Sequence, residues 1–66
     1  MNIYYVNVYN ASGLRIAKYD GFSSVISAQF FSASLLKDRE YRNHQAEIFC
    51  ANKPHDISMN IIHSEV

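Results

Sequence analysis

The sequence predicts an α+β fold with the element order ββαββ, in which one small antiparallel sheet carries a single helix packed on one face. Three observations lead to this fold class. Four short segments are rich in β-branched and aromatic residues, one longer segment has apolar residues at helical spacing, and turn-forming residues separate them. With 66 residues, 48% of them hydrophobic, the chain predicts one domain over residues 1–66, with a core near the lower limit of independent stability.

The first two strands are predicted to form a hairpin. Ile3–Tyr9 alternates in the manner of a half-buried strand. The side chains expected on its core side are those of Tyr4, Val6 and Val8, and the opposite side carries Ile3, Tyr5, Asn7 and Tyr9. Residues 10–13 suit a tight reversal, because asparagine and glycine tolerate positive φ. Leu14–Tyr19 returns as the second strand, and Asp20 and Gly21 end it. In this strand the expected core side chains are Leu14 and Ile16, and the opposite side carries Arg15, Ala17 and Tyr19.

A helix is predicted over Ser24–Glu40. Ser23 or Ser24 can cap it, because a serine side chain accepts a hydrogen bond from an unpaired backbone N–H of the first turn. The helical pattern ends near Tyr41–His44, where Asn43 suits the left-handed conformation that often closes a helix.

The apolar residues of this helix fall on two separate faces at 100° per residue. The wider face, which we expect to cover the sheet, holds Val25, Ile26, Phe30, Ala33 and Leu36. The narrower face holds Ala28, Phe31 and Leu35. Because a chain this short can bury only one face by itself, we expect the narrower face to bind a larger protein target or, as a homodimer through the helix, a second copy. Alternatively, the tail Ile62–Val66 folds over it.

The last two strands are predicted to form a second hairpin. Gln45–Ala51 places Ala46, Ile48 and Cys50 on one side, with Glu47 and Phe49 on the other. Residues 52–56 form the turn, since Pro54 fixes its own φ and disfavours helix in the residue before it. Ile57–His63 then alternates as the fourth strand. Its two sides carry Ile57, Met59 and Ile61 against Ser58, Asn60 and Ile62. The strand order within the sheet stays open.

One helix covers one side of such a sheet, so the other side is expected to be an exposed aromatic face. Its predicted members are Tyr5, Tyr9, Tyr19 and Phe49. Tyrosine suits protein interfaces because its ring is apolar and its hydroxyl still forms hydrogen bonds. Two alternatives remain open: the rings only stabilise the sheet as cross-strand pairs, or they stack on the bases of single-stranded nucleic acid. The basic residues available to the nucleic-acid alternative are Arg15, Lys18, Lys37, Arg39 and Arg42.

The charge balance argues against nucleic acid as the main partner. Six basic and six acidic residues cancel to a formal net charge of zero. Affinity for nucleic acid comes largely from lysine and arginine side chains that neutralise phosphates. The local cluster of Lys37, Arg39 and Arg42 is interleaved with Asp38 and Glu40, which is more typical of the solvated end of a helix.

No residue pattern indicates a catalytic, metal or cofactor site, so we expect a protein that is not an enzyme. The three histidines lack the spacing of a zinc motif, and Cys50, the only cysteine, lies on an expected core side. Neither a glycine-rich phosphate loop nor a nucleophile elbow occurs. The single cysteine and the absence of a signal-peptide pattern favour a cytoplasmic location. No segment approaches the ~20 apolar residues of a membrane span, so we expect no membrane partner.

These observations predict a protein-binding module that regulates or inhibits a larger intracellular protein by occupying its surface. In size and composition the chain resembles compact inhibitors encoded by phages and other mobile elements, including anti-CRISPR proteins. The resemblance implies a block of host defence by steric occupation, with aromatic anchors supplying most of the affinity. The alternative function is a small nucleic-acid-binding protein that uses the aromatic face of the sheet. A third possibility is a structural subunit of a larger assembly, in which the narrower face of the helix is permanently covered.

Overall fold

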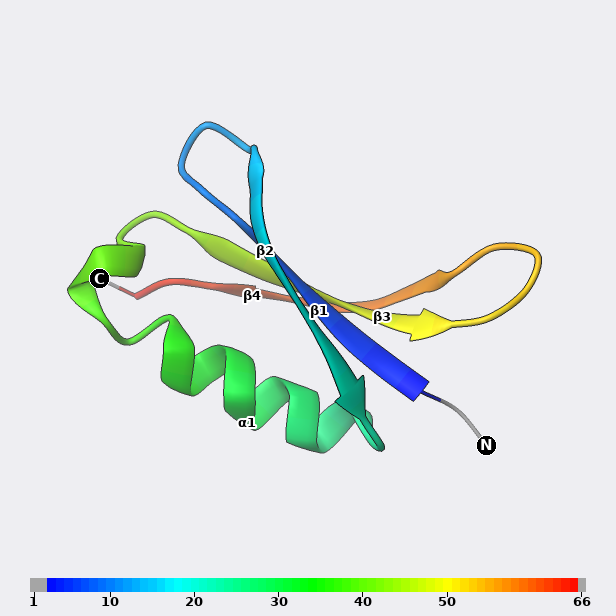
Figure 1. Ribbon diagram of the computed structural model, residues 1–66. Coiled ribbons are helices and arrows are strands. Elements are labelled where there is room, and N and C mark those ends of the chain that lie inside the picture. The colour runs from blue at the N-terminus through cyan, green and yellow to red at the C-terminus, as the bar shows by residue number, and fades with distance from the viewer. Residues whose placement is uncertain (1–2, 66) are drawn as a thin grey trace.

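The computed structural model describes residues 3–65 and shows a four-stranded antiparallel sheet with one helix packed on one face (Figure 1). The strands are β1 (Ile3–Tyr9), β2 (Arg15–Phe22), β3 (Gln45–Ala51) and β4 (Ile57–His63). Helix α1 (Val25–Leu35) and a short 3-10 helix, η1 (Arg39–Tyr41), connect β2 to β3. The predicted order ββαββ is confirmed, and β1, β3 and β4 have the predicted bounds.

The strand order β2-β1-β3-β4 places the two hairpins side by side. The central strands β1 and β3 are antiparallel and pair without interruption from Ile3↔Ala51 to Tyr9↔Gln45. Strands β2 and β4 form the two edges of the sheet. Helix α1 crosses the face that lies below the sheet in Figure 1, and the two hairpin loops point away from each other. Each central strand therefore presents one face to the helix and the other away from it.

Asn10 organises the β1–β2 reversal. Its side-chain Oδ1 accepts hydrogen bonds from the backbone N–H groups of Ser12 and Leu14, both at 3.0 Å. The backbone N–H of Gly13 donates to the carbonyl of Asn10 at 2.9 Å, and Gly13 has a φ of 84°. Such a φ favours glycine because it has no Cβ. The reversal predicted at residues 10–13 is thus explained by Asn10, whose side chain accepts hydrogen bonds from the backbone N–H groups of its own loop.

Two irregularities in the β1–β2 pairing reverse the predicted sides of β2. Tyr19 pairs with Val6 and Ala17 pairs with Val8, which places both on the core face. Leu14 and Ile16, predicted for the core, are exposed. Those predictions are wrong because the register shifts on both sides of this segment, and a shift of one residue turns each side chain to the other face.

The predicted end of β2 at Asp20 and Gly21 is wrong as well. The strand continues through both residues to Phe22. Gly21 has a φ of 91°, a backbone conformation that few other residues adopt readily. The glycine therefore bends the strand at an irregular position and does not end it.

Helix α1 begins one residue after the predicted start, with the predicted cap Ser24, and it ends earlier than predicted. The Ser24 hydroxyl accepts a hydrogen bond from the backbone N–H of Ser27 at 3.1 Å, as an N-cap does. The helix stops at Leu35, and the Asp38 side chain accepts from the backbone N–H of Glu40 at 3.0 Å, which caps η1. The Asp38 carboxylate thus takes a backbone N–H that a longer α-helix would use, and this opposes continuation of α1 over residues 36–40. Asn43 has a φ of 59°, the predicted left-handed conformation, but it follows η1.

The core lies between α1 and the two central strands. Its fully buried side chains are Val6, Val8, Ala28, Leu36, Ala46 and Ile48. Ser32 is also buried, and its hydroxyl donates to the carbonyl of Ala28 at 2.8 Å, so its burial leaves no unpaired donor. Cys50 is a buried free thiol on the predicted side of β3.

The face of α1 that meets the sheet is the opposite of the predicted one. Ala28 is buried, and Phe31 and Leu35 pack against the core. The Phe31 ring lies 4.8 Å from the Tyr19 ring and 5.2 Å from the Phe22 ring, between centroids. On the face predicted to cover the sheet, Ile26 and Phe30 are 64% and 73% exposed. Leu36, which follows the last residue of α1, is the member of that predicted face that the core does bury.

The prediction of a homodimer through Ala28, Phe31 and Leu35 is therefore corrected. Ala28 is buried against the sheet, and Phe31 and Leu35 are partly buried against the same core. The small side chains of Ala28 and Ser32 let the helix approach the sheet closely along this line, and Phe31 fills the space beside Tyr19. No folded-over tail is needed: Ile62 packs against the core as part of β4. Val66 lies outside the described residues.

Candidate protein-binding face

The sheet face turned away from α1 is called the open face here. Because side chains alternate along a strand, the neighbours of buried Val6 and Val8 point to it. Residues that pair with these neighbours on β2 and β3 lie on the same face. The β4 residues that pair with those β3 residues lie on it as well. The open face consists of Tyr5, Asn7, Tyr9, Arg15, Lys18, Gln45, Glu47, Phe49, Ser58, Ile61 and His63.

A stacked aromatic pair forms one end of the open face. Tyr5 and Phe49 are directly opposite each other on the central strands, and their rings lie 5.2 Å apart between centroids at an angle of 15°. The Lys18 ammonium lies 4.5 Å from the centroid of the Tyr5 ring, close enough for a cation–π contact. Two rings and a cation from three strands therefore form one ordered layer.

The Tyr5 hydroxyl ties this layer to the β3–β4 loop. It donates a hydrogen bond to Oδ2 of Asp56 at 2.5 Å, and Oδ1 of the same carboxylate accepts from the Asn52 backbone N–H at 3.1 Å. The hydrogen bond to Asp56, then burial and the nearby negative charge, raise the pKa of Tyr5 to about 12. The same hydrogen bond from Tyr5, followed by the one from Asn52, lowers the pKa of Asp56 below its ordinary value.

The centre of the open face is polar. Asn7 lies opposite Lys18 on β2 and Glu47 on β3, and only 7% of its surface is exposed. Its Nδ2 donates to the Tyr9 hydroxyl over a long 3.4 Å, and its buried Oδ1 has no hydrogen-bond partner among residues 3–65. Beside it, the Ser58 hydroxyl donates to Oε2 of Glu47 at 2.6 Å.

Exposed aliphatic side chains border this face on the edge strands. Ile61 lies opposite Glu47 and is about half exposed, as are Ile16 of β2 and Met59 of β4. Both of these positions adjoin irregularities in the pairing of their strands. The face is thus an aromatic and aliphatic surface around a polar centre. Its content of tyrosine, phenylalanine and methionine is typical of protein interfaces.

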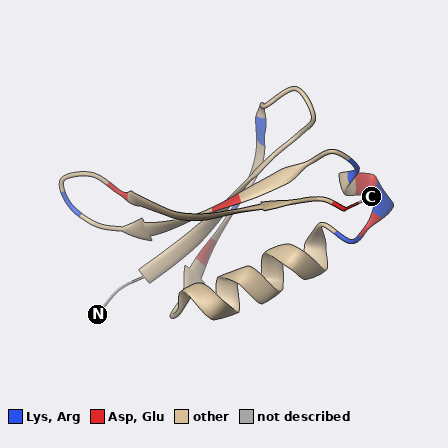
Figure 2. Cartoon of the chain, turned by 180° about the vertical axis from the view of Figure 1, so that it is seen from behind, with Lys and Arg blue, Asp and Glu red and all other residues tan. Residues whose placement is uncertain are grey.

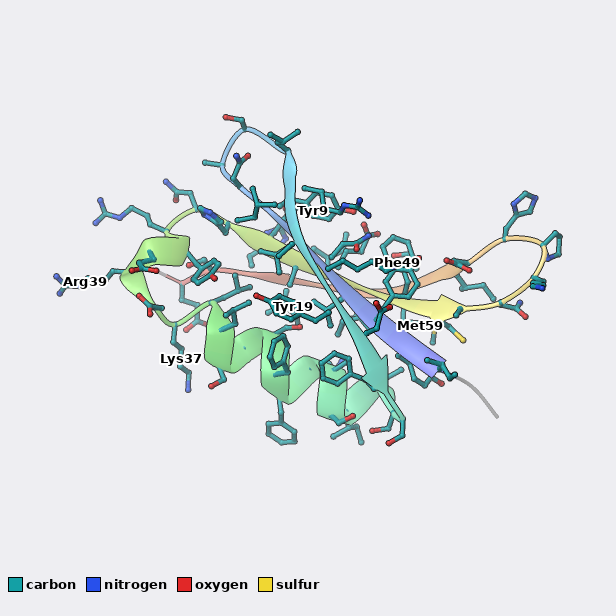
Figure 3. All side chains as sticks on the ribbon, viewed as in Figure 1. Tyr9, Tyr19, Lys37, Arg39, Phe49 and Met59 are labelled. Atoms are coloured by element: carbon teal, nitrogen blue, oxygen red, sulfur yellow. The ribbon has the colours of Figure 1, made fainter. Side chains whose placement is uncertain are left out.

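The structure brings together three of the four aromatic residues predicted for this face. Tyr5, Tyr9 and Phe49 lie on it, and in Figure 3 Tyr9 and Phe49 are on the side of the sheet away from the helix. Tyr19 does not belong to it. That ring lies between β2 and α1, in edge contact with Phe31. The prediction for Tyr19 is wrong for the same reason as for Ala17: the register of β2 is shifted.

The five basic residues considered for nucleic acid do not form one groove. Arg15 and Lys18 belong to β2, whereas Lys37, Arg39 and Arg42 surround η1. Figure 2 shows basic and acidic segments mixed along this turn, and Lys37 and Arg39 project from it in Figure 3. Lys18 is also 3.8 Å from the Asp20 carboxylate. Positive charge near the stacked rings is therefore partly neutralised.

Sequence reasoning missed one participant of the open face, Asp56, and the exact placement of two others. Asn7 and Lys18 are placed beside the rings by strand pairing, which a single strand's pattern does not reveal. Asp56 meets Tyr5 across a separation of 51 residues. Alternation did predict that Asn7 shares a face with Tyr5 and Tyr9, but only the paired strands show how deeply it is buried.

Across residues 3–65, no group of three histidine, cysteine, aspartate or glutamate side chains could hold a metal ion. In the same range, no helix has the length and apolar character needed to span a membrane.

The chain was also compared with protein-family models, curated proteins and solved structures, and no match was found in any of the three comparisons. Its function is therefore argued from its own surfaces.

Proposed function

We propose that this chain is a non-enzymatic protein-binding module that occupies the surface of a larger cytoplasmic protein through the open face, and so regulates or inhibits it. The observation that carries the proposal is the stacked pair of Tyr5 and Phe49 on the sheet face opposite α1. Inhibition by steric occupation needs no catalytic group. It is also the mode of action that the size of the chain suggests, as in compact inhibitors of host defence.

The order within the aromatic layer supports a binding role. Tyr5 is held by the ring of Phe49, the ammonium of Lys18 and the carboxylate of Asp56. Side chains already fixed in the free protein lose little conformational entropy on binding, which favours affinity. Tyrosine is also among the residues that most often dominate the binding energy of an interface.

The charge of the face supports a protein partner over nucleic acid. Glu47 and Asp56 lie beside the same rings as Lys18, so the face is not uniformly positive. A nucleic-acid groove would need several uncompensated cations along the path of the backbone. The contact of Lys18 with the Tyr5 ring is the one observation in favour of nucleic acid, and the experiment below includes that outcome.

The test is affinity capture from the source cell with the parent chain, Tyr5→Ala/Tyr9→Ala and Leu14→Glu as a control. Leu14 is 66% exposed in the β1–β2 loop, outside the open face. We expect the parent and the control to capture the same protein after nuclease treatment. The double variant should bind it at least about tenfold more weakly.

Salt dependence and fold are measured alongside binding. Binding to a protein through an aromatic face should change little with added salt, whereas binding to nucleic acid should fall steeply. Circular dichroism and the thermal midpoint verify that the double variant is folded. Capture that is unaffected by the double substitution, or binding that is lost on nuclease treatment, would contradict the proposal.

A further inference from the structure

The exposed side of α1 is apolar and carries no charge. None of the residues of Val25–Leu35 is acidic or basic. Ile26 and Phe30 are separated by four positions and therefore form one ridge along the helix. They are among the most exposed large hydrophobic side chains of the described residues, at 64% and 73%. The buried residues Ala28 and Ser32 lie on the opposite side of the helix. This ridge lies outside the open face.

A hollow of about 160 Å³ lies next to this ridge, between the C-terminal half of α1 and the end of β4. Its apolar lining comes from Ala33, Leu36 and Ile62, and the remaining lining residues are Lys37, His63 and Glu65. A cavity of about 150 Å³ can hold a benzene ring. The hollow therefore has the size and the apolar character to receive one phenyl side chain.

We propose that a second copy of this chain docks on α1, with Phe30 of each copy seated in the hollow of the other. A twofold interface uses the same patch on both copies, so a protruding ring and a receiving hollow must lie on one face. When the two helices are antiparallel and the twofold axis passes near Ala33, Phe30 of one copy lies opposite Leu36 of the second copy. These two positions lie equally far from the axis, about 4.5 Å along the helix.

The residues at the crossing fit this arrangement. Ala33 and Ser34 are small and exposed, so two helix backbones can approach closely where the axis passes. The uncharged helix meets no repulsion from its own copy. At the rim of the hollow, Lys37 and Glu65 have opposite charges, so the patch carries no net charge that would repel its own copy.

The first test is the molar mass in solution, measured by light scattering over a concentration series. We expect the parent chain to reach twice the chain mass and Phe30→Glu to remain at the chain mass. Leu14→Glu is the matched control, because it adds the same charge at an equally exposed hydrophobic position away from the ridge. It should remain dimeric. A parent chain that stays monomeric at high micromolar concentration would overturn the proposal, as would a dimer that survives Phe30→Glu.

The second test does not depend on the folding of Phe30→Glu. Cys50 is the only cysteine, so Cys50→Ala gives a background in which one introduced thiol can be followed. Ala33→Cys should form an intermolecular disulfide rapidly under mild oxidation, because the axis brings the two copies of this position together. Leu14→Cys should cross-link only at the rate of random collision. Equal rates for the two variants would exclude the proposed axis. Since neither test involves the open face, failure here leaves the proposed function untouched.

Discussion

At the scale of single residues, Phe30 and Phe31 show how one step along a helix separates core from surface. The two rings are 100° apart on the helix, and only Phe31 contacts Tyr19 and Phe22. We expect Phe31→Ala to lower the free energy of unfolding by about 2–3 kcal/mol, because it removes a ring packed against the core. Phe30→Ala should change it by about 0.5 kcal/mol or less in dilute solution. Urea unfolding followed by circular dichroism measures both. Equal losses would contradict the observed orientation of α1.

Asn7 is a second residue whose position has an energetic consequence. Its Oδ1 is buried without a hydrogen-bond partner among residues 3–65, which is unfavourable. Asn7→Val removes this acceptor and places a β-branched side chain in a central strand, so we expect a gain of about 1 kcal/mol. Asn60 is the matched control, because its Oδ1 accepts from the Ile61 backbone N–H at 2.9 Å. Asn60→Val should bring no such gain in urea unfolding. A loss of stability in Asn7→Val would show that the buried amide is satisfied.

At the scale of elements, regular alternation was enough to predict β1, β3 and β4, whereas β2 required information from its partner strand. A bulge has no reliable signature in a short sequence, so the sides of Ala17 and Tyr19 could not be read from β2 alone. The orientation of α1 was also undetermined, since both of its faces are apolar. Close packing decided between them: Ala28 and Ser32 fit against the sheet, and the larger Ile26 and Phe30 do not.

The same limits apply to the candidate site. Tyr5, Tyr9 and Phe49 were grouped correctly because their strands are regular. The contact between Tyr5 and Asp56 joins β1 to the β3–β4 loop, and no local pattern indicates it. Contacts between elements that are distant in the sequence depend on the assembled sheet, and here they fix the side chains that the proposed function uses.

The hydrogen bond between Tyr5 and Asp56 predicts how pH affects this pair of elements. It lowers the pKa of Asp56 below the ordinary value of 3.8. The stabilisation from this hydrogen bond is therefore fully present above pH 3.8 and is lost as the pH falls through the lowered pKa of Asp56. It raises the pKa of Tyr5 to about 12 from 10.0, so the contribution is present below pH 10.0 and is lost as pH rises towards about 12.

NMR titration of the Tyr5 ring tests this reading. In the parent chain the ring should titrate near pH 12. In Asp56→Asn it should titrate closer to 10.0, because the carboxylate acceptor and its charge are gone. An unchanged Tyr5 titration in Asp56→Asn would show that the carboxylate does not hold the hydroxyl in solution.

At the scale of the whole molecule, a chain of 66 residues has a small core, so covering the ridge of Ile26 and Phe30 should add measurably to its stability. If folded chains associate and unfolded chains do not, mass action makes the thermal midpoint rise with protein concentration. We expect this rise for the parent chain and for Leu14→Glu, and a constant midpoint for Phe30→Glu. Differential scanning calorimetry over a wide concentration range measures it. A constant midpoint in all three proteins would mean that the folded chain does not associate. A rise that persists in Phe30→Glu would place the contact between copies on another surface.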